Sequence, residues 1–231
     1  MNKTGDTKKA ETAVRTDKYP HSDNDWENFD VLHINRLPSA ATFMAYTTKE
    51  KAVKNDKSQS EYFQSLNGTW KFQFVPRSDQ RPMDFFEKGH DVSGWGNIKV
   101  PANWEMEGYG HPFYVGAGYG IKRNPPLIAV ENSPVGSYKR TFNVPANWKG
   151  KQIVLHFGGV ASAFYVWVNG EKVGYSQDSK TPSEFDITPY AVTGQNEIAV
   201  QVFKFSDGYY LEDQDYWRFA GIQRDVYLYA R

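Results

Sequence analysis

The residues best suited to chemistry lie near the end of the chain, in an acidic run interleaved with aromatic side chains. Four carboxylates fall within nine positions, namely Asp207, Glu212, Asp213 and Asp215. Such a cluster suits a cation site, a site for sugar hydroxyls, or a pair of glycosidase carboxylates. It equally suits a solvated acidic turn that is partly paired with Arg218 and Arg224. Spacing alone leaves these alternatives open.

Several other chemistries are excluded by residue type. The chain has no cysteine, which excludes disulfides, thiolate metal sites and a cysteine nucleophile. Its five histidines are scattered, without zinc-ligand spacing and without a Gly-x-Ser-x-Gly motif elsewhere. The glycine-rich run 116–120 lacks the Gly-Lys-Ser/Thr ending of a phosphate-binding loop. Lys plus Arg and Asp plus Glu both number 27, so no net charge favours nucleic acid or an anionic membrane.

Alternation of apolar and polar residues predicts short strands throughout the part of the chain that must position these groups. The alternating segments are 69–74, 138–142, 153–157, 164–168, 197–202 and 226–228. Asn169-Gly170 predicts a type I′ hairpin turn, in which both central residues need positive φ. With almost no helical periodicity, the pattern predicts an all-β fold, an antiparallel β-sandwich or jelly roll.

Other segments depart from this strand pattern. Residues 1–24 are polar and predict a disordered tail, which leaves residues 25–231 as the sandwich domain. Residues 49–60 predict a loop or a short exposed helix, and a brief helix is expected within residues 58–66. Residues 101–136 are broken by glycines and prolines, yet their aromatic side chains indicate an ordered excursion across one end of the sandwich.

A series of short blocks in one order resembles a known family. Asp25-Trp26-Glu27-Asn28 opens the series, and Asp213-Gln214-Asp215 lies near its end. The blocks between them are residues 65–72, 100–109, 124–126, 131–132, 136–138, 168–170, 174–179, 182–186 and 206–208. Together they resemble the bacterial β-galactosidases of glycoside hydrolase family 2, over residues 25–229. The last block favours β-galactosidases over the related β-glucuronidases and β-mannosidases.

The resemblance implies that this chain is the N-terminal sugar-binding domain, a jelly-roll β-sandwich like other galactose-binding domains. In the family it is followed by an immunoglobulin-like domain and a (β/α)₈ barrel. Two barrel glutamates hydrolyse terminal non-reducing β-D-galactosides by a retaining mechanism. The catalytic residues and the catalytic magnesium are therefore expected downstream of this chain, which should be inactive alone.

Two residues of the chain acquire expected roles from the same resemblance. Asp215 matches the family aspartate that reaches the barrel, where it binds a sodium ion and the galactosyl 6-hydroxyl. Gly116 stands where family members often place an asparagine against the sugar. The substrate contact at Gly116 is therefore expected to be weak, and the sodium site is expected to be shared with the barrel.

The sequence leaves other functions and partners open. A stand-alone carbohydrate-binding module is one alternative, and a structural fragment without catalysis is another. The resemblance implies three partners, a β-galactoside, the remaining domains of the parent enzyme, and further copies in a homo-oligomer. No nucleic acid or membrane partner is expected. Residues 1–30 lack the apolar stretch of a signal peptide, which leaves both cytoplasm and periplasm open.

Overall fold

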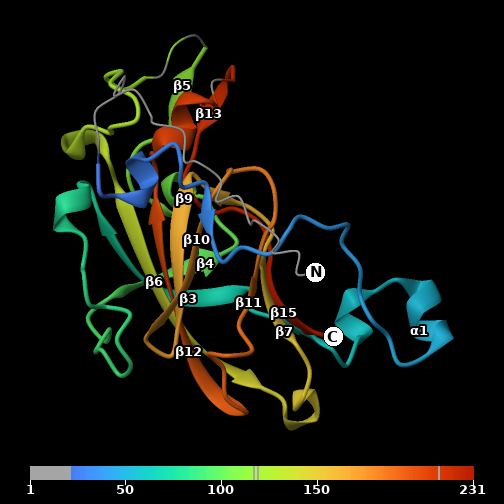
Figure 1. Ribbon diagram of the computed structural model, residues 1–231. Coiled ribbons are helices and arrows are strands. Elements are labelled where there is room, and N and C mark those ends of the chain that lie inside the picture. Colours follow the sequence, from blue (N-terminus) through green and yellow to red (C-terminus); the bar gives the residue numbers. More distant parts are fainter. Residues whose placement is uncertain (1–21, 117, 119, 213) are drawn as a thin grey trace, which may run out of the picture.

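The computed structural model describes residues 22–231 except residues 117, 119 and 213. Antiparallel strands form two sheets that pack face to face, which confirms the predicted all-β sandwich (Figure 1). The predicted tail, residues 1–24, falls mostly on residues 1–21, outside the described part. None of the helices in the described part of the chain has the length and hydrophobicity of a membrane-spanning segment.

The larger sheet has seven strands, all paired antiparallel. In spatial order they are β1 (His33–Ile34), β10 (Glu171–Gln177), β9 (Ala163–Val168), β12 (Gly194–Phe203), β6 (Val135–Val144), β3 (Gly68–Val75) and β4 (Gly96–Val100). Strands β9 and β10 are joined by Asn169 and Gly170, whose φ angles are 53° and 88°. The predicted hairpin turn is confirmed, because both residues adopt positive φ.

A four-stranded sheet forms the second layer, and small elements complete the fold. Its order is β11 (Ser183–Asp186), β7 (Ile153–Phe157), β15 (Val226–Ala230) and β2 (Phe63–Ser65). Two further pairs join β13 (Tyr216–Arg218) to β5 (Phe113–Val115) and β14 (Gly221–Ile222) to β8 (Val160–Ala161). The helical turns are α1 (Lys49–Lys54), η1 (Asp25–Glu27), η2 (Lys57–Gln59), η3 (Ser78–Gln80), η4 (Trp104–Glu107), η5 (Val130–Asn132), η6 (Ala146–Trp148) and η7 (Asp207–Tyr210).

The main core lies between the two sheets. Along β9, Phe164, Val166 and Val168 point into this core, as the alternating pattern predicts. Tyr165 and Trp167 point to the opposite face, where they join a second buried cluster that includes residues of the loops covering the large sheet. Both faces of the large sheet are therefore covered.

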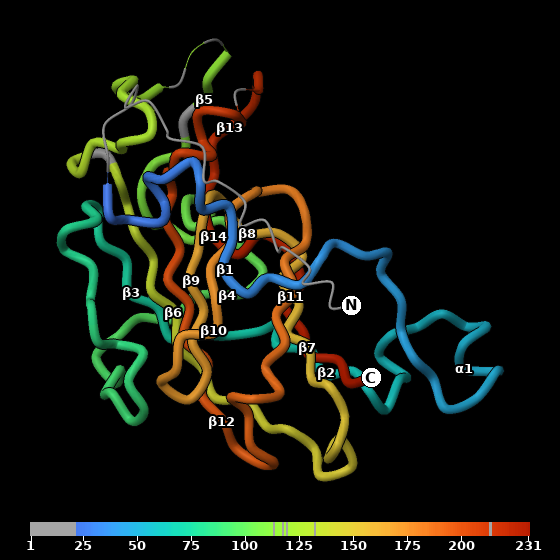
Figure 2. The backbone as a smooth tube through the Cα atoms, viewed as in Figure 1, coloured from blue at the N-terminus to red at the C-terminus, as the bar shows by residue number. Residues whose placement is uncertain are grey.

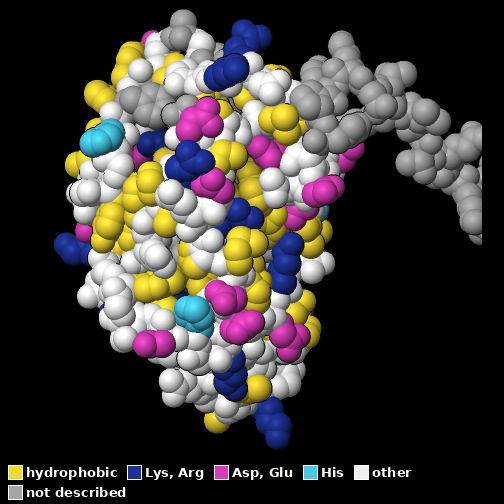
Figure 3. Space-filling view, turned by 90° about the vertical axis from the view of Figure 1, so that its left-hand side faces the viewer, with side chains coloured by type: hydrophobic (Ala, Val, Ile, Leu, Met, Phe, Trp, Pro, Cys, Tyr) yellow, Lys and Arg dark blue, Asp and Glu magenta, His cyan; other side chains and the backbone are white. Residues whose placement is uncertain are grey.

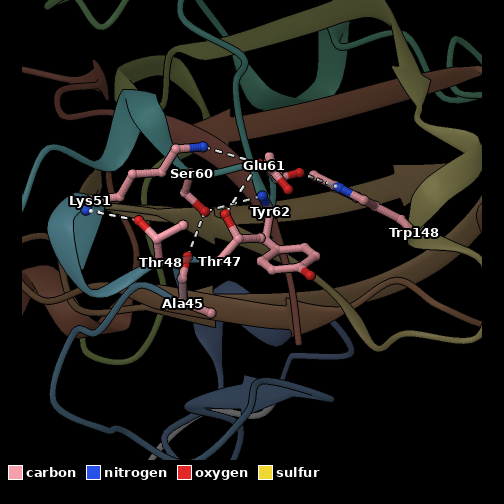
Figure 4. A network of polar contacts seen from close by, with 8 residues as sticks. All are labelled: Ala45, Thr47, Thr48, Lys51, Ser60, Glu61, Tyr62 and Trp148. Atoms are coloured by element: carbon pink, nitrogen blue, oxygen red, sulfur yellow. Dashed lines mark hydrogen bonds and ion pairs between the residues drawn. The ribbon is translucent and has the colours of Figure 1, made fainter.

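The segment before β2 covers the outer face of the four-stranded sheet. Leu37 and Met44 pack there against buried residues of β7 and β15. A polar network fixes this segment: Ser60 Oγ donates to the carbonyl of Ala45 at 2.6 Å, and Trp148 Nε1 donates to the carbonyl of Glu61 at 2.8 Å (Figure 4). Helix α1 belongs to this segment, which confirms the short exposed helix expected within residues 49–60.

The prediction of a brief helix within residues 58–66 is wrong for most of that range. Phe63–Ser65 instead form β2, which pairs with β15. The ring of Phe63 packs 5.2 Å from that of Tyr227 on the neighbouring strand. Pairing with a neighbouring strand and ring packing outweigh the local preference, as is common in short segments.

The excursion over residues 101–136 is ordered along its described length. The backbone N–H of Ala102 donates to Ile222 at 2.8 Å, and that of Trp104 donates to Ala220 at 2.9 Å. The excursion then forms β5, which lies beside β13 at the end of the molecule drawn at the top of Figure 2. The prediction of an ordered excursion across one end of the sandwich is confirmed.

Candidate functional site

The two residues singled out by sequence lie opposite each other on the β5–β13 ribbon. Its register pairs Tyr114 with Trp217 and Val115 with Tyr216. Continued by one residue, this register sets Gly116 opposite Asp215, on the same face as Tyr114 and Trp217. A β-carbon at Gly116 would lie 3.6 Å from Oδ1 of Asp215. The structure therefore brings Asp215 and Gly116 together. The roles expected for them come from the family resemblance.

The outward face of the ribbon carries a carboxylate and two aromatic groups. Tyr114 donates its hydroxyl to Oδ1 of Asp215, and the neighbouring carboxylate raises the pKa of Tyr114. Trp217 packs edge-on against Tyr114, with ring centroids 5.8 Å apart. Tyr114 is 55% exposed and Trp217 is 53% exposed. An indole face beside a carboxylate can hold a ligand with one apolar face and hydroxyls at its edge.

The inward face of the ribbon is anchored by Arg218. This residue is buried, and its guanidinium donates to the carbonyls of Glu212 at 2.6 Å and Gln214 at 3.0 Å. The guanidinium also lies 4.3 Å from the ring centroid of Tyr216. Arg218 thus binds the main chain of the loop that ends at Asp215, which fixes the path of that loop.

Arg224 is the other arginine proposed to pair with the acidic run, and it contacts a different segment of the chain. Its Nη1 donates to the carbonyl of Lys180 at 3.0 Å. Arg218 and Arg224 thus both donate to main-chain oxygens of described residues.

The carboxylates of the acidic run are in different environments. Glu212 accepts from the backbone N–H and the hydroxyl of Ser179, at 2.8 and 2.6 Å. Asp207 is buried and accepts from Nε2 of Gln177 at 2.6 Å. Burial raises the pKa of Asp207 to about 6. Asp213 lies outside the described residues. Only Asp215, among the described members, lies on the exposed ribbon face with Tyr114 and Trp217.

Sequence reasoning missed Tyr114 and Trp217 as members of this site. Both lie in three-residue strands that are too short for a period-two pattern to identify. The available signal was indirect: Tyr114 is two residues before Gly116, and Trp217 is two residues after Asp215. Residues two apart on a strand share a face, so any ribbon through Asp215 would place Trp217 beside it.

Comparison with known proteins identifies the family. The family profile described as "Glycosyl hydrolases family 2, sugar binding domain" matches residues 63–231. The chain belongs to this family. The β-galactosidase of Priestia megaterium is 45% identical over 234 residues, which cover all of this chain and 22% of that protein. The β-galactosidase of Halalkalibacterium halodurans is 45% identical over 91% of this chain and 21% of its own length.

This sugar-binding domain spans about a fifth of the length of these β-galactosidases. Solved structures support the same fold. The β-glucuronidase 2 of Bacteroides uniformis, bound covalently to cyclophellitol-6-carboxylate aziridine, matches 73% of this chain and 18% of that chain. Its identity is 27% and its TM-score is 0.55. A β-glycosidase from Bacteroides vulgatus matches with 26% identity and a TM-score of 0.52, over 73% of this chain and 20% of its own. The predicted resemblance to family 2 β-galactosidases is confirmed.

Proposed function

We propose that this domain supplies part of the galactosyl-binding site of a β-galactosidase whose catalytic groups lie elsewhere in the polypeptide. The single observation that carries the proposal is the exposed face of the β5–β13 ribbon. There Asp215, Tyr114 and Trp217 lie together with Gly116, which has no side chain. A site built for a larger assembly is expected to be exposed in the domain that contributes only one side of it.

In this proposal Asp215 accepts a hydrogen bond from the 6-hydroxyl of the galactosyl unit. The hydroxyl of Tyr114 occupies Oδ1 of Asp215, which favours use of Oδ2 for the sugar. Gly116 has no side chain to offer a second hydrogen bond. The role of the domain is therefore to bind and orient the sugar, and it moves no proton at the scissile bond.

Sodium fits the same carboxylate as a shared ligand. A hard cation prefers several oxygen ligands, and a carboxylate is a favourable one. Among the described residues, no group of three or more His, Asp or Glu side chains could hold a metal ion. If Asp215 binds sodium, we propose that further oxygen ligands from the rest of the polypeptide complete the site. Bound sodium would supply positive charge beside the 6-hydroxyl.

The bond-breaking groups are proposed to be two glutamates of a retaining mechanism in the rest of the polypeptide. One would protonate the leaving oxygen, and the other would attack the anomeric carbon. Terminal β-D-galactosides are the proposed substrates because the two relatives at 45% identity are β-galactosidases. Because the catalytic glutamates are proposed to lie in the rest of the polypeptide, the isolated domain is predicted not to hydrolyse a chromogenic β-galactoside.

A chimera tests the proposal. In the Priestia megaterium β-galactosidase, the matching segment is replaced by this chain, and hydrolysis is measured over a range of sodium concentrations. We expect activity with a sodium-dependent KM, and we expect Asp215→Asn to abolish the sodium dependence. The matched control is Asp178→Asn, another exposed aspartate of the domain. Sodium dependence that survives Asp215→Asn would refute the proposed role of Asp215.

A further inference from the structure

A cavity of about 780 Å³ opens beside the excursion and is separate from the ribbon face. Its accessible lining includes Phe74, Tyr109, His111, Ile121, Lys122 and Glu131. Asp215, Tyr114 and Trp217 are not among its lining residues. Ligand pockets in proteins have volumes of roughly 300–1,000 Å³, so this cavity can hold a molecule of disaccharide size.

A buried ion pair lies at the floor of the cavity, and its two charges are opposite. Lys204 Nζ lies 2.5 Å from Oε1 of Glu105, and their side chains are 7% and 1% exposed. The second carboxylate oxygen of Glu105 accepts from the backbone N–H of Ala220 at 3.1 Å. Lys204 also donates to the carbonyl of His111 at 3.3 Å. The charges of Lys204 and Glu105 therefore offset each other at the floor of the cavity.

The walls are apolar and partly exposed. Phe74 and Tyr109 are half-buried, and their ring centroids lie 5.9 Å apart with an interplanar angle of 37°. Ile121 is half-buried on the facing loop. Two neighbouring rings of this kind can pack against the C–H face of a pyranose, because an aromatic face is apolar and flat.

The rim carries exposed charges of both signs. Lys122 can donate to a ligand oxygen, Glu131 can accept from a ligand hydroxyl, and His111 can do either. An ionised ligand would meet a like charge on one side of the rim. A purely apolar ligand would remove these polar groups from water without replacing their hydrogen bonds. A neutral molecule with many hydroxyls can donate hydrogen bonds to the negative group and accept them from the positive group.

We infer that this cavity is a second carbohydrate-binding site, for a neutral di- or trisaccharide, distinct from the galactosyl contact at Asp215. Apolar and oppositely charged side chains are interleaved over the side of the molecule seen in Figure 3. The inference goes beyond the proposed function and does not depend on it, since the two sites share none of the named ligand-contacting residues.

Backbone amide NMR spectra of the isotope-labelled chain test the inference. Lactose and cellobiose are titrated to concentrations on the order of 10 mM, at which an open site of modest affinity is detectably filled. We expect the amide signals of residues 108–111 and 121–122 to shift in a saturable way. Glu131→Gln with Lys122→Gln should weaken binding about tenfold, since each loses a charge-assisted hydrogen bond. Ile121→Trp should fill the cavity and abolish the shifts.

The controls separate this inference from the proposed function. Glu171→Gln, an exposed change on the β9–β10 hairpin, should leave the shifts unchanged, and so should Asp215→Asn. Absence of saturable shifts in residues 108–111 and 121–122 with either disaccharide would overturn the inference and leave the role of Asp215 untouched. Shifts caused by benzyl alcohol and by neither sugar would also overturn it, because they would assign the cavity to an apolar ligand.

Discussion

Tyr114 donates a hydrogen bond to Asp215 across the β5–β13 ribbon, although 101 residues separate them in the chain. The contact links the excursion of residues 101–136 to the loop that follows η7. The hydrogen bond holds Oδ1 of Asp215 on an exposed face, and it thereby also sets the orientation of Oδ2. The proposed sugar contact depends on this arrangement.

The hydrogen bond has a measurable effect on Tyr114. The hydrogen bond to Asp215 raises the pKa of the Tyr114 phenol, because only the protonated phenol can donate it, and ionised tyrosine would also lie beside a second negative charge. Asp215→Asn should therefore lower the pKa of Tyr114 toward its ordinary value. An NMR titration of ring-labelled tyrosine measures this directly. Asp178→Asn is the control, and an unchanged Tyr114 pKa in Asp215→Asn would show that the two groups do not interact in solution.

An asparagine should be accommodated at position 116. The space near Gly116 admits a β-carbon at ordinary van der Waals distance, 3.5 Å from Cε1 of Tyr114 and 3.6 Å from Asp215 Oδ1. Gly116→Asn should change the free energy of unfolding by less than about 0.5 kcal/mol, as is usual for surface changes. In the chimera it should lower KM, because the amide can reach the sugar beside Asp215. A raised KM would mean that the asparagine obstructs the sugar.

Arg218 should be the residue on which the acidic loop depends most. Arg218→Ala removes charge-assisted hydrogen bonds to the carbonyls of Glu212 and Gln214. The loss of stability should be about 2 kcal/mol, measured by urea unfolding. Arg77→Ala is the matched control, since the Arg77–Asp79 pair is exposed and should contribute little to stability. Equal losses for both variants would contradict the anchoring role.

Asp207 should make stability depend on pH. Burial raises its pKa from the ordinary 3.8 to about 6, so the fold favours the neutral carboxyl. Well below pH 3.8 both folded and unfolded chains bind the proton, and the group has no effect on stability. As pH rises from about 4 to about 6 the unfolded chain ionises first, and stability should fall by about 2–3 kcal/mol.

Asp207→Asn should remove this decrease, because asparagine keeps an acceptor for Gln177 and cannot ionise. Urea unfolding of the wild type and the variant between pH 4 and pH 7, in a sodium-free buffer, measures the decrease. The curves of wild type and variant should separate as pH rises. Parallel curves would show that Asp207 is ionised without penalty in the folded chain.

The strands could be predicted because their signal is local. Alternation in β9 distinguishes Val166 from Trp167 without reference to any other segment. The ribbon could not be predicted in this way, because its register joins two short strands and no local pattern specifies it. The acidic run placed Asp215 among four candidate carboxylates, and the resemblance selected it and pointed to Gly116. The buried Lys204–Glu105 pair had no sequence signal, since charged residues are most often exposed.

The central claim is that Asp215 binds the galactosyl 6-hydroxyl, and one comparison tests it most directly. The chimera and its Asp215→Asn variant are assayed with an aryl β-D-galactoside and with the β-D-fucoside, which lacks only that hydroxyl. The account predicts that the chimera prefers the galactoside in kcat/KM by about tenfold to a hundredfold, and that Asp215→Asn removes the preference. If Asp215→Asn lowers kcat/KM equally for both substrates, Asp215 does not contact the 6-hydroxyl.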